Sequence, residues 1–493
     1  MKTGMIGIHL NGEAHGERRR RHGGARGADR ARRGAAAFAV LLALPAPDGL
    51  QPAAWRVAAA GVWMGTWWMT EALPLAATAL LPILLFPLLG AGTAAQAAAP
   101  YADPTVFLFL GGFMLALAMQ RWGLHRRIAL TIMRGMSDRP AGLVLGTMAA
   151  TAFISMWVNN TATVLMMLPI GLSVVEVVEQ CDADEPNFAP ALLLGIVYAA
   201  AVGGLGTLIG TPPNTLLAGF LEKTYGIRVS FVAWMTIGIP LVLLLLPVAW
   251  GVVTRMIVPL GRAPIAGSRA FLARERAALG PATRPEWIVA ATFVAADALW
   301  IARPALEGVL PGLSDAGIAL GAAALLFALP AGQGRGRVLT WETAGRLPWD
   351  VLLLFGGGLS LADAIGRTGL ASWIGGSLAG VGRWPDWGVA VAVGVVLVVL
   401  SEVASNTAAA VTFLPVIASL AVSQGESPLA LAVVATLAAS GGFILPVASP
   451  PNAIAYGTGR VTMRQMARGG IVMDLVFALV VPLVALVLLR FVR

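Results

Sequence analysis

Charged residues are scarce in this sequence. Only 12% of its 493 residues are Asp, Glu, Lys or Arg, whereas 58% are hydrophobic. Soluble domains carry about 25% charged residues, and this chain has several apolar runs long enough to cross a bilayer. The scarcity of charge therefore excludes an ordinary soluble domain and predicts an all-helical polytopic membrane protein, with the lipid bilayer as its surroundings.

Cysteine and histidine are scarce as well. The single cysteine, Cys181, excludes a disulfide framework and a cysteine-rich metal site. None of the four histidines has the spacing of a metal-ligand pair. The sequence also lacks a His-Glu-x-x-His motif, a Gly-x-Ser-x-Gly motif and a cysteine partnered by histidine. We therefore expect neither an enzyme nor an organic cofactor.

The net charge of +9 comes from arginine-rich segments. We interpret residues 1–34 as a disordered basic cytoplasmic tail, with binding to lipid headgroups as the alternative. Further arginines cluster in links between apolar segments, at Arg121–Arg139, Arg255–Arg284, Arg335–Arg346 and Arg460–Arg468. The positive-inside rule places these links, and the N-terminus, in the cytoplasm. The basic charge thus indicates orientation in a membrane and no nucleic-acid partner.

Apolar segments of spanning length predict about eleven transmembrane helices. They lie near residues 35–50, 54–70, 72–90, 105–120, 190–220, 231–259, 286–303, 315–330, 349–366, 428–457 and 470–491. Two further apolar blocks, 141–178 and 388–423, hold polar residues and a proline in the middle. The basic links all lie on the cytoplasmic side only if each of these two blocks enters and leaves the membrane on the same side. We therefore expect two re-entrant hairpins besides the eleven crossings.

An internal repeat relates the two halves of the chain. The segment from Phe109 aligns with the segment from Phe355, and Asn160 aligns with Asn406, at one constant shift (406 − 160 = 246). The first copy is followed by a much more basic link than the second, which indicates opposite orientations in the bilayer. The repeat predicts inverted halves, 35–254 and 286–493, joined by a cytoplasmic linker at 255–285.

Each half carries two polar interruptions. The hairpin blocks contain SMWVNNTATVLMMLP, from Ser155, and SEVASNTAAAVTFLP, from Ser401. Later come GGLGTLIGTPPNTL, from Gly203, and SGGFILPVASPPNAI, from Ser440. Two consecutive prolines cannot continue a helix, and the carbonyl groups freed at membrane depth are tolerated only where they line a cavity or face protein.

The chemistry of these interruptions suits a sodium ion. Hydroxyl, carboxamide and carbonyl oxygens are hard, uncharged ligands, and half-helix N-termini can receive an anion. Neither hairpin tip offers Lys or Arg to a carboxylate. Bound cations would then have to supply the positive potential, which predicts cation-coupled binding of an anion.

The sequence resembles the divalent anion:sodium symporters, which carry dicarboxylates, tricarboxylates or sulfate. The resemblance rests on Trp63–Gly90, on Asn159-Asn160-Thr161 and Ser405-Asn406-Thr407, and on a C-terminal signature. That signature fits Ser440, Phe443, Pro446 and Asn452 and departs at Ala455, where valine is usual. The resemblance implies an elevator-type fold, a homodimer and the inner membrane of a bacterium.

The resemblance also implies site residues. The first of two sodium sites would use Ser155, Asn159, Asn160 and a carbonyl near Gly210, and the second would use Ser401, Ala404, Asn406 and a carbonyl near Ala448. The substrate would meet Asn159, Asn160, Thr161, Ser405, Asn406 and Thr407, with Thr211, Pro212, Ser449 and Pro450 closing the site. Asn159 stands where the family usually has serine, so ion fit and substrate size could change.

We therefore expect sodium-coupled symport of a small dianion such as succinate, malate or fumarate. Exchange of dicarboxylates without sodium, and transport of sulfate or a tricarboxylate, remain alternatives. Glu71 and Glu402 are acidic residues at or near membrane depth and are functional candidates on that ground. Glu402 could carry a proton or hydrogen-bond to helix ends.

Overall fold

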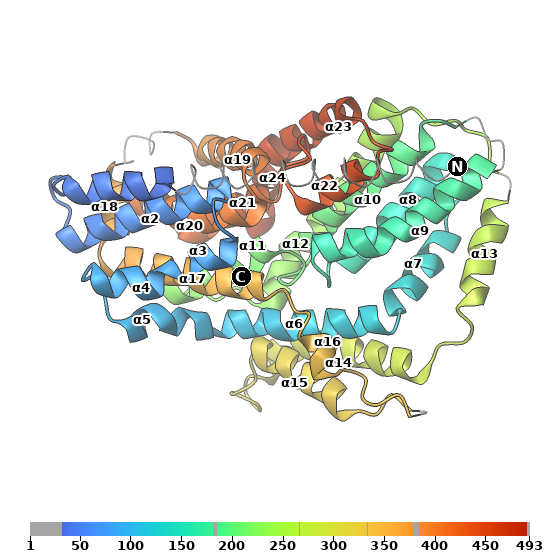
Figure 1. Cartoon of the computed structure of the whole chain (residues 1–493), viewed down its shortest axis with the longest axis horizontal. Coiled ribbons are helices and arrows are strands. Elements are labelled where there is room, and N and C mark those ends of the chain that lie inside the picture. The colour runs from blue at the N-terminus through green and yellow to red at the C-terminus, as the bar shows by residue number, and fades with distance from the viewer. Residues whose placement is uncertain (1–31, 181–184, 266, 333, 378–383, 491–493) are drawn as a thin grey trace, which may run out of the picture.

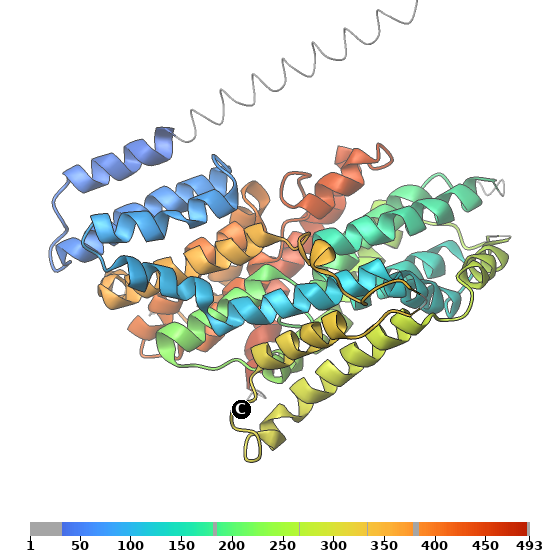
Figure 2. The same ribbon diagram turned by 60° about the horizontal axis from the view of Figure 1, so that its bottom comes forward.

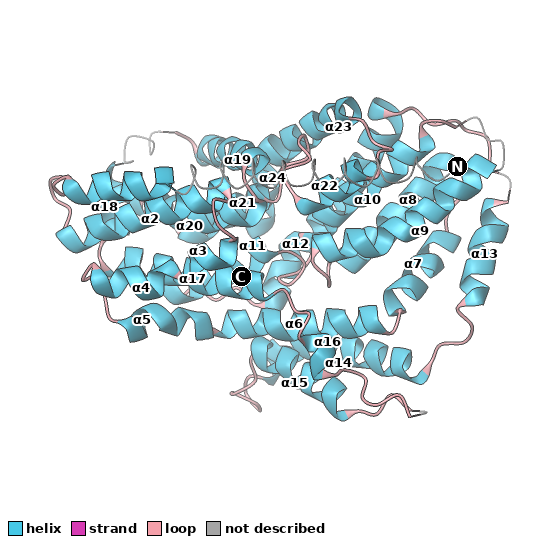
Figure 3. Cartoon of the chain, viewed as in Figure 1, coloured by secondary structure: helices cyan, strands magenta, loops and turns pink. Residues whose placement is uncertain are grey.

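The structure is a computed structural model of the whole chain, and it describes residues 32–180, 185–265, 267–332, 334–377 and 384–490. The expected tail at 1–34 lies almost entirely outside these residues. The described residues form helices and loops without a β-strand, apart from one isolated bridge between Pro330 and Arg337 (Figure 3). This confirms the all-helical fold class.

Eight helices of the described chain are long and apolar enough to cross a membrane. They are Ala94–Arg121, Asn160–Glu179, Phe231–Ile257, Arg284–Leu306, Trp349–Arg367, Asp386–Val403, Asn406–Ser423 and Met463–Leu489. Shorter apolar helices cover Leu75–Leu88, Pro140–Ser155, Phe188–Gly204, Asp315–Ala328 and Pro428–Ala439. A polytopic membrane protein is thereby supported, while the count of eleven crossings stays a prediction.

Several expected spans are interrupted helices. The segment 72–90 consists of α3 (Leu75–Ala79) and α4 (Leu81–Leu88). The Pro-Pro segments divide α10 (Phe188–Gly204) from α11 (Pro212–Tyr225), and α21 (Pro428–Ala439) from α22 (Pro450–Gly457). The prolines occupy the first turns of α11 and α22, where a missing amide donor costs no hydrogen bond. The first expected span, 35–50, is helical only to residue 43.

The two polar hairpin blocks are pairs of antiparallel helices joined by short tips. The first pair is α8 (Pro140–Ser155) and α9 (Asn160–Gln180), and the second is α19 (Asp386–Val403) and α20 (Asn406–Ser423). Figure 1 shows the first pair in the right half of the molecule and the second pair in the left half. Helix α10 packs against α8 and α9, as α21 packs against α19 and α20. Each hairpin thus packs against an equivalent helix in its own half of the chain.

Several of the remaining helices form a framework around the hairpins. It includes α2 (Pro52–Thr70), α5 (Ala94–Ala98), α6 (Pro104–Arg121), α14 (Arg284–Leu306), α15 (Asp315–Ala328) and α17 (Trp349–Arg367). Helices α14 and α15 lie against α6, which Figure 2 shows from below. Helix α12 (Phe231–Gly251), with the π-turns at Val252–Ile257, ends the first half of the chain. Helices α23 (Met463–Leu475) and α24 (Val481–Leu489) end the second half.

Two glycines related by the 246-residue shift permit close packing in this framework. A Cβ atom on Gly111 of α6 would lie 2.6 Å from Ala319 of α15. A Cβ atom on Gly357 of α17 would lie 2.3 Å from the carbonyl oxygen of Ala79. Small residues let the backbones of membrane helices approach closely. The repeat seen in the sequence is therefore also a repeat of helix packing.

Short helices connect the framework to the hairpins. They are α7 (Leu124–Arg134), which leads to the first hairpin, and α18 (Leu370–Ser377), which precedes the second. Helix α13 (Ser268–Ala278) packs on α7. Arg127 of α7 forms a buried ion pair with Glu286, with 2.7 Å between Nε and Oε1, and also donates to the carbonyl of Gly280. These bonds tie α7 to the link between α13 and α14 and to the first turn of α14.

Candidate functional site

Both hairpin tips and both Pro-Pro breaks line one cavity of about 740 Å³. All ten residues expected to contact the substrate are part of its wall: Asn159, Asn160, Thr161, Thr211, Pro212, Ser405, Asn406, Thr407, Ser449 and Pro450. Among the residues expected at the sodium sites, Ala448 also lines the cavity, whereas Ser155, Gly210, Ser401 and Ala404 do not. The structure thus brings together four segments that are far apart in the sequence.

The oxygens of the first half converge behind the tip of the first hairpin. The buried hydroxyl of Ser155 lies within hydrogen-bond distance of two acceptors, Asn160 Oδ1 at 3.0 Å and the carbonyl of Ala200 at 2.8 Å, which share its one proton. A Cβ atom placed on Gly204 would lie 2.4 Å from Asn160 Oδ1 and 3.3 Å from the carbonyl oxygen of Gly210. Asn160 and Gly210 therefore direct oxygens toward the same small space beside Gly204.

The second half repeats this arrangement. The buried Ser401 hydroxyl donates to the carbonyl of Ala439 at 2.9 Å. Asn406 Oδ1 is buried and has no hydrogen-bond partner among the described residues. A Cβ atom on Gly442 would lie 3.3 Å from Asn406 Oδ1, 3.3 Å from the Ser401 carbonyl oxygen and 3.5 Å from the Ala448 Cβ atom. An unpaired, buried carboxamide oxygen beside a carbonyl suits a hard cation.

Asn159 and Ser405 perform the same local task at the two tips. The Asn159 Oδ1 atom accepts the amide of Ala162 at 2.9 Å, and the Ser405 hydroxyl accepts the amide of Ala408 at 3.2 Å. Asparagine and serine are both favoured at helix N-caps because a side-chain oxygen can accept a free amide of the first turn. The replacement of serine by Asn159 therefore preserves the cap of α9.

The asparagine that follows each Pro-Pro pair closes the broken helix onto itself. Asn214 Nδ2 donates to the carbonyls of Gly204 and Thr207 at 3.0 and 2.8 Å. Asn452 Nδ2 donates to the carbonyls of Gly442 and Leu445, both at 3.0 Å. We call these two groups of bonds the asparagine clamps. The paired Pro-Pro-Asn motifs point to such a role, although sequence reasoning does not identify the carbonyls that are bound.

Three charged residues of the framework also line the cavity. They are Glu71, Arg346 and Asp350, and Arg346 is the only basic residue among the described residues of the cavity wall. Glu71 caps the end of α2 with a φ of 47°, and its backbone amide donates to the carbonyl of Trp67. Sequence reasoning singles out Glu71 by its depth but misses Arg346, which looks like one member of a basic cytoplasmic link.

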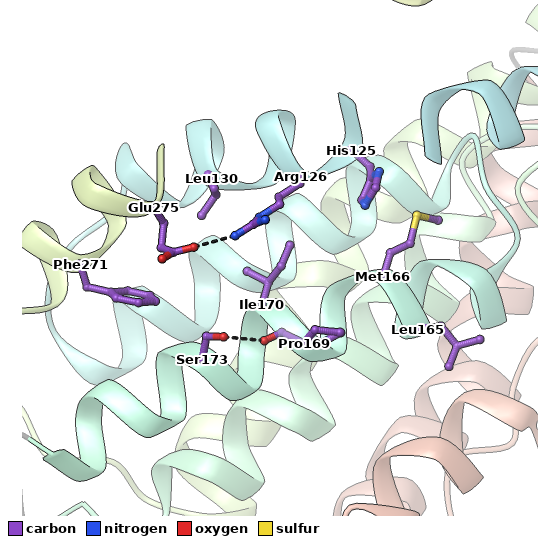
Figure 4. Close-up of a pocket in the computed structure, with 10 residues that line it drawn as sticks. All are labelled: His125, Arg126, Leu130, Leu165, Met166, Pro169, Ile170, Ser173, Phe271 and Glu275. Atoms are coloured by element: carbon purple, nitrogen blue, oxygen red, sulfur yellow. Dashed lines mark hydrogen bonds and ion pairs between the residues drawn. The ribbon is translucent and has the colours of Figure 1, made fainter. Parts of the chain in front are cut away.

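A smaller cavity of about 370 Å³ lies away from the tips, between α7, α9 and α13. Figure 4 shows Arg126 of α7 paired with Glu275 of α13 at its edge, with 2.7 Å between Nη2 and Oε2. His125 also lines this cavity, and its burial lowers the pKa of the imidazole below the ordinary 6.5. The cavity shares Leu165 of α9 with the larger cavity, but none of the ten residues expected to contact the substrate lines it.

Comparison with known proteins gives two concordant results. A family model described as the sodium:sulfate symporter transmembrane region matches residues 33–491. The sodium-dependent dicarboxylate transporter SdcS of Staphylococcus saprophyticus is 38% identical over 458 residues, which cover 91% of this chain and 88% of that protein. The protein of the same name from Staphylococcus aureus strain USA300 is 41% identical over 441 residues, which cover 87% of this chain and 84% of that protein. The chain therefore belongs to the sodium:sulfate symporter family, the divalent anion:sodium symporters that its motifs resemble.

Proposed function

We propose that this protein is a secondary active transporter that carries a small dicarboxylate together with Na⁺. The observation that carries the proposal is the single cavity in which both hairpin tips and both Pro-Pro breaks meet. The names of the two staphylococcal relatives support a dicarboxylate as the substrate. Succinate, malate and fumarate are the candidates of matching charge and size.

The two groups of oxygens behind the tips are the proposed sodium sites. Asn160 Oδ1 and the Gly210 carbonyl face the space beside Gly204, with Ser155 supporting Asn160. Asn406 Oδ1 and the Ser401 carbonyl face the space beside Gly442. Ser401, Ala404 and Ala448 complete the second set. The tip residues Asn160, Thr161, Asn406 and Thr407, with the N-termini of α11 and α22, would receive the two carboxylates.

The charge of the cavity wall explains why an anion needs cations there. Glu71 and Asp350 contribute two negative charges and Arg346 one positive charge, so the described wall has a net charge of 1 − 2 = −1. A dianion that enters this wall alone is repelled. Two sodium ions behind the tips would reverse the sign, and linkage then requires that each ligand increases the affinity for the other. The composition of the wall thus supports the proposed coupling.

The position of Arg346 suggests which side the cavity faces. Arg346 and Pro348 come from the link before α17 and Asp350 from its first turn, and the arginine bias of this link favours the cytoplasm. No residue of the equivalent stretch 91–103 is among the described lining residues. This supports a cavity open toward the cytoplasm, a cytoplasmic N-terminus and placement in a bacterial inner membrane. An elevator movement of the inverted halves, 35–254 and 286–493, within a homodimer, with eleven crossings and two hairpins, completes the proposal.

Uptake of labelled succinate into proteoliposomes tests this function. We expect accumulation with an inward Na⁺ gradient and little uptake when choline replaces Na⁺. Asn160→Ala and Asn406→Ala should abolish uptake while the protein still inserts and purifies normally. Normal uptake by either variant would contradict the site assignment, because each removes the central oxygen of one proposed sodium site.

The same assay separates the remaining candidates. Uptake that ignores Na⁺ but requires a dicarboxylate inside the vesicles would indicate exchange. A proton gradient that replaces the Na⁺ gradient would indicate proton coupling. Sulfate is the second substrate candidate because of the family model, and competition between sulfate and labelled succinate measures its relative affinity.

A further inference from the structure

The smaller cavity, between α7, α9 and α13, is not used by the proposed function. Its volume of about 370 Å³ is large enough for a ligand, since ligand pockets measure about 300–1,000 Å³. Such pockets are mostly apolar and hold a few polar groups that orient the ligand. The chemistry of the two sides of this cavity therefore indicates what it binds.

Helix α9 provides most of the apolar side. Six apolar side chains line the cavity: Leu165, Met166, Pro169 and Ile170 from α9, Leu130 from α7 and Phe271 from α13. The four residues of α9 lie on one helical face because they occupy two adjacent turns at the same angle. Leu165 is 54% exposed, so the described chain leaves this face partly uncovered. An uncovered apolar face beside a cavity suits a hydrocarbon chain.

The charged groups lie along the edge that α7 and α13 form (Figure 4). Arg126 binds Glu275 through Nη2, and no other described residue accepts a hydrogen bond from its five donors. The guanidinium of Arg274 lies 5.8 Å from the ring centroid of Phe271, which lines the cavity. Together with Arg276, these charged residues give the edge a net charge of 3 − 1 = +2. The edge is therefore complementary to an anionic group.

The two sides of the cavity differ in their expected depth in the membrane. Helices α7 and α13 belong to the arginine-rich links that the positive-inside rule places at the cytoplasmic surface. Helix α9 leads from there to the hairpin tip at Asn160. The basic edge then lies at the level of the lipid headgroups, and the apolar side extends inward. Basic pockets between helices on the cytoplasmic side are typical binding sites for anionic lipids.

We propose that the smaller cavity binds an anionic phospholipid of the cytoplasmic leaflet, with part of one acyl chain against α9 and the phosphate near Arg126 and Arg274. The inference goes beyond the proposed function and shares with it only the cytoplasmic placement of the links. Leu165 lines both cavities and lies five residues after Asn160 in the same helix. The lipid would thus brace α9 against the connectors without entering the substrate site.

Thermal unfolding of the purified full-length protein in a neutral detergent measures lipid binding without transport. Phosphatidylglycerol and phosphatidylcholine with the same acyl chains are added to the micelles at constant salt. A ligand that binds the folded state raises the melting temperature, so we expect phosphatidylglycerol to act at lower concentrations than phosphatidylcholine. Glycerol 3-phosphate, which has the phosphate without the chains, should have no effect at the same concentrations.

Two arginine variants test the polar edge. Arg126→Gln and Arg274→Gln should each raise the phosphatidylglycerol concentration for half-maximal stabilisation about fivefold, the contribution of one basic residue near an anionic lipid. Arg274 is exposed and has no ion pair among the described residues, so its replacement keeps the test available if Arg126→Gln folds poorly. Arg464→Gln is the matched control, because Arg464 is an exposed arginine of another basic link and does not line this cavity.

Ser173→Phe tests the apolar side. Ser173 lines the cavity from α9, and its hydroxyl donates to the carbonyl of Pro169 at 3.0 Å. A phenylalanine at this position would occupy the space proposed for the acyl chain. We expect the parent to prefer phosphatidylglycerol with long chains over the short-chain form, and Ser173→Phe to lose most of this preference. An unchanged preference in Ser173→Phe would contradict the placement of the chain.

The outcomes separate a built lipid site from general attraction to a basic surface. A preference for phosphatidylglycerol that weakens in both arginine variants and persists in Arg464→Gln supports the inference. Equal effects of the two lipids, or an equal loss in Arg464→Gln, would overturn it. Stabilisation by glycerol 3-phosphate alone would indicate a phosphate site and would overturn it as well. Na⁺-driven succinate uptake by the same variants tests the proposed function separately, so either proposal can fail while the other stands.

Discussion

Gly204→Ala is a small change that should act specifically on the proposed first sodium site. The new methyl group would lie 2.4 Å from Asn160 Oδ1 and 3.3 Å from the Gly210 carbonyl oxygen. The contact with Asn160 involves the end of a flexible side chain, so the carboxamide can rotate away. That rotation breaks the 3.0 Å bond from Ser155 and withdraws the Asn160 oxygen from the site. We therefore expect a folded protein with a damaged ion site.

The size of the effect follows from two contributions. Displacing the Asn160 side chain from its rotamer costs about 1 kcal/mol, and losing the Ser155 hydrogen bond costs about another 1 kcal/mol. Their sum of about 2 kcal/mol corresponds to roughly 30-fold weaker Na⁺ binding. We expect the Na⁺ concentration for half-maximal succinate uptake to rise by about this factor.

Proteoliposome uptake at fixed succinate and varied Na⁺ measures this change. Gly321→Ala is the matched control, because Gly321 lies in α15 and no atom lies within 4 Å of its added methyl group. The control should keep the Na⁺ dependence of the parent. If Gly204→Ala shows the same half-saturation as Gly321→Ala, the space beside Gly204 does not hold a coupling ion, and the first site must be elsewhere.

Three further predictions concern the clamp, the cavity wall and the connectors. Asn452→Ala leaves the buried carbonyls of Gly442 and Leu445 without donors, so the free energy of unfolding should fall by about 2 kcal/mol. The control is Asn187→Ala, which loses a single hydrogen bond at a more exposed position. If Asn452→Ala melts no lower than this control, the clamp does not stabilise the fold. Arg346→Gln should raise the KM for succinate about threefold at low salt and less at high salt, because salt screens the attraction between arginine and dianion. Uptake into inside-out vesicles measures this KM from the cytoplasmic side. An equal rise in KM from both sides of the membrane would show that Arg346 does not act only at the cytoplasmic opening. Burial lowers the pKa of His125 in the folded protein, so below about pH 6.5 the unfolded chain binds the proton more readily and the folded state loses stability. His125→Gln should therefore lose less melting temperature than the parent between about pH 7.5 and 5.5. An equal loss in both proteins would refute this cause.

The sequence predicts the tip residues well because polar residues are rare in segments that are otherwise apolar. Asn160 and Asn406 stand in apolar segments, at equivalent places of an inverted repeat, and polar groups at membrane depth have few alternatives to a cavity. The Pro-Pro pairs identify the helix breaks because two consecutive prolines cannot continue a helix. The all-helical fold and the convergence of the four polar segments could thus be predicted from spacing, repeat and family resemblance together.

Other features depend on packing between distant segments. Asp474 precedes no polar motif and has no acidic counterpart in the first half, so only the packing of α23 on the loop 442–445 reveals that Asp474 and Glu402 together accept four backbone amides of this loop. Arg346 belongs to a basic link by composition, and only the structure shows that this link and the hairpin tips line the same cavity. A comparison of motifs registers Asn159 only as a replacement of serine. Its role as a helix cap becomes visible only in the backbone geometry.

The asparagine clamps have a consequence for the cost of binding. Asn214 and Asn452 fix the carbonyls of both broken helices through bonds within the protein, and these bonds do not require an ion. A cation that arrives at such a site does not have to order the loop, so little of its binding free energy is lost as conformational entropy. At the proposed sodium sites, Na⁺ would then bind and leave in each cycle with a modest affinity, because the folded protein already orders the site.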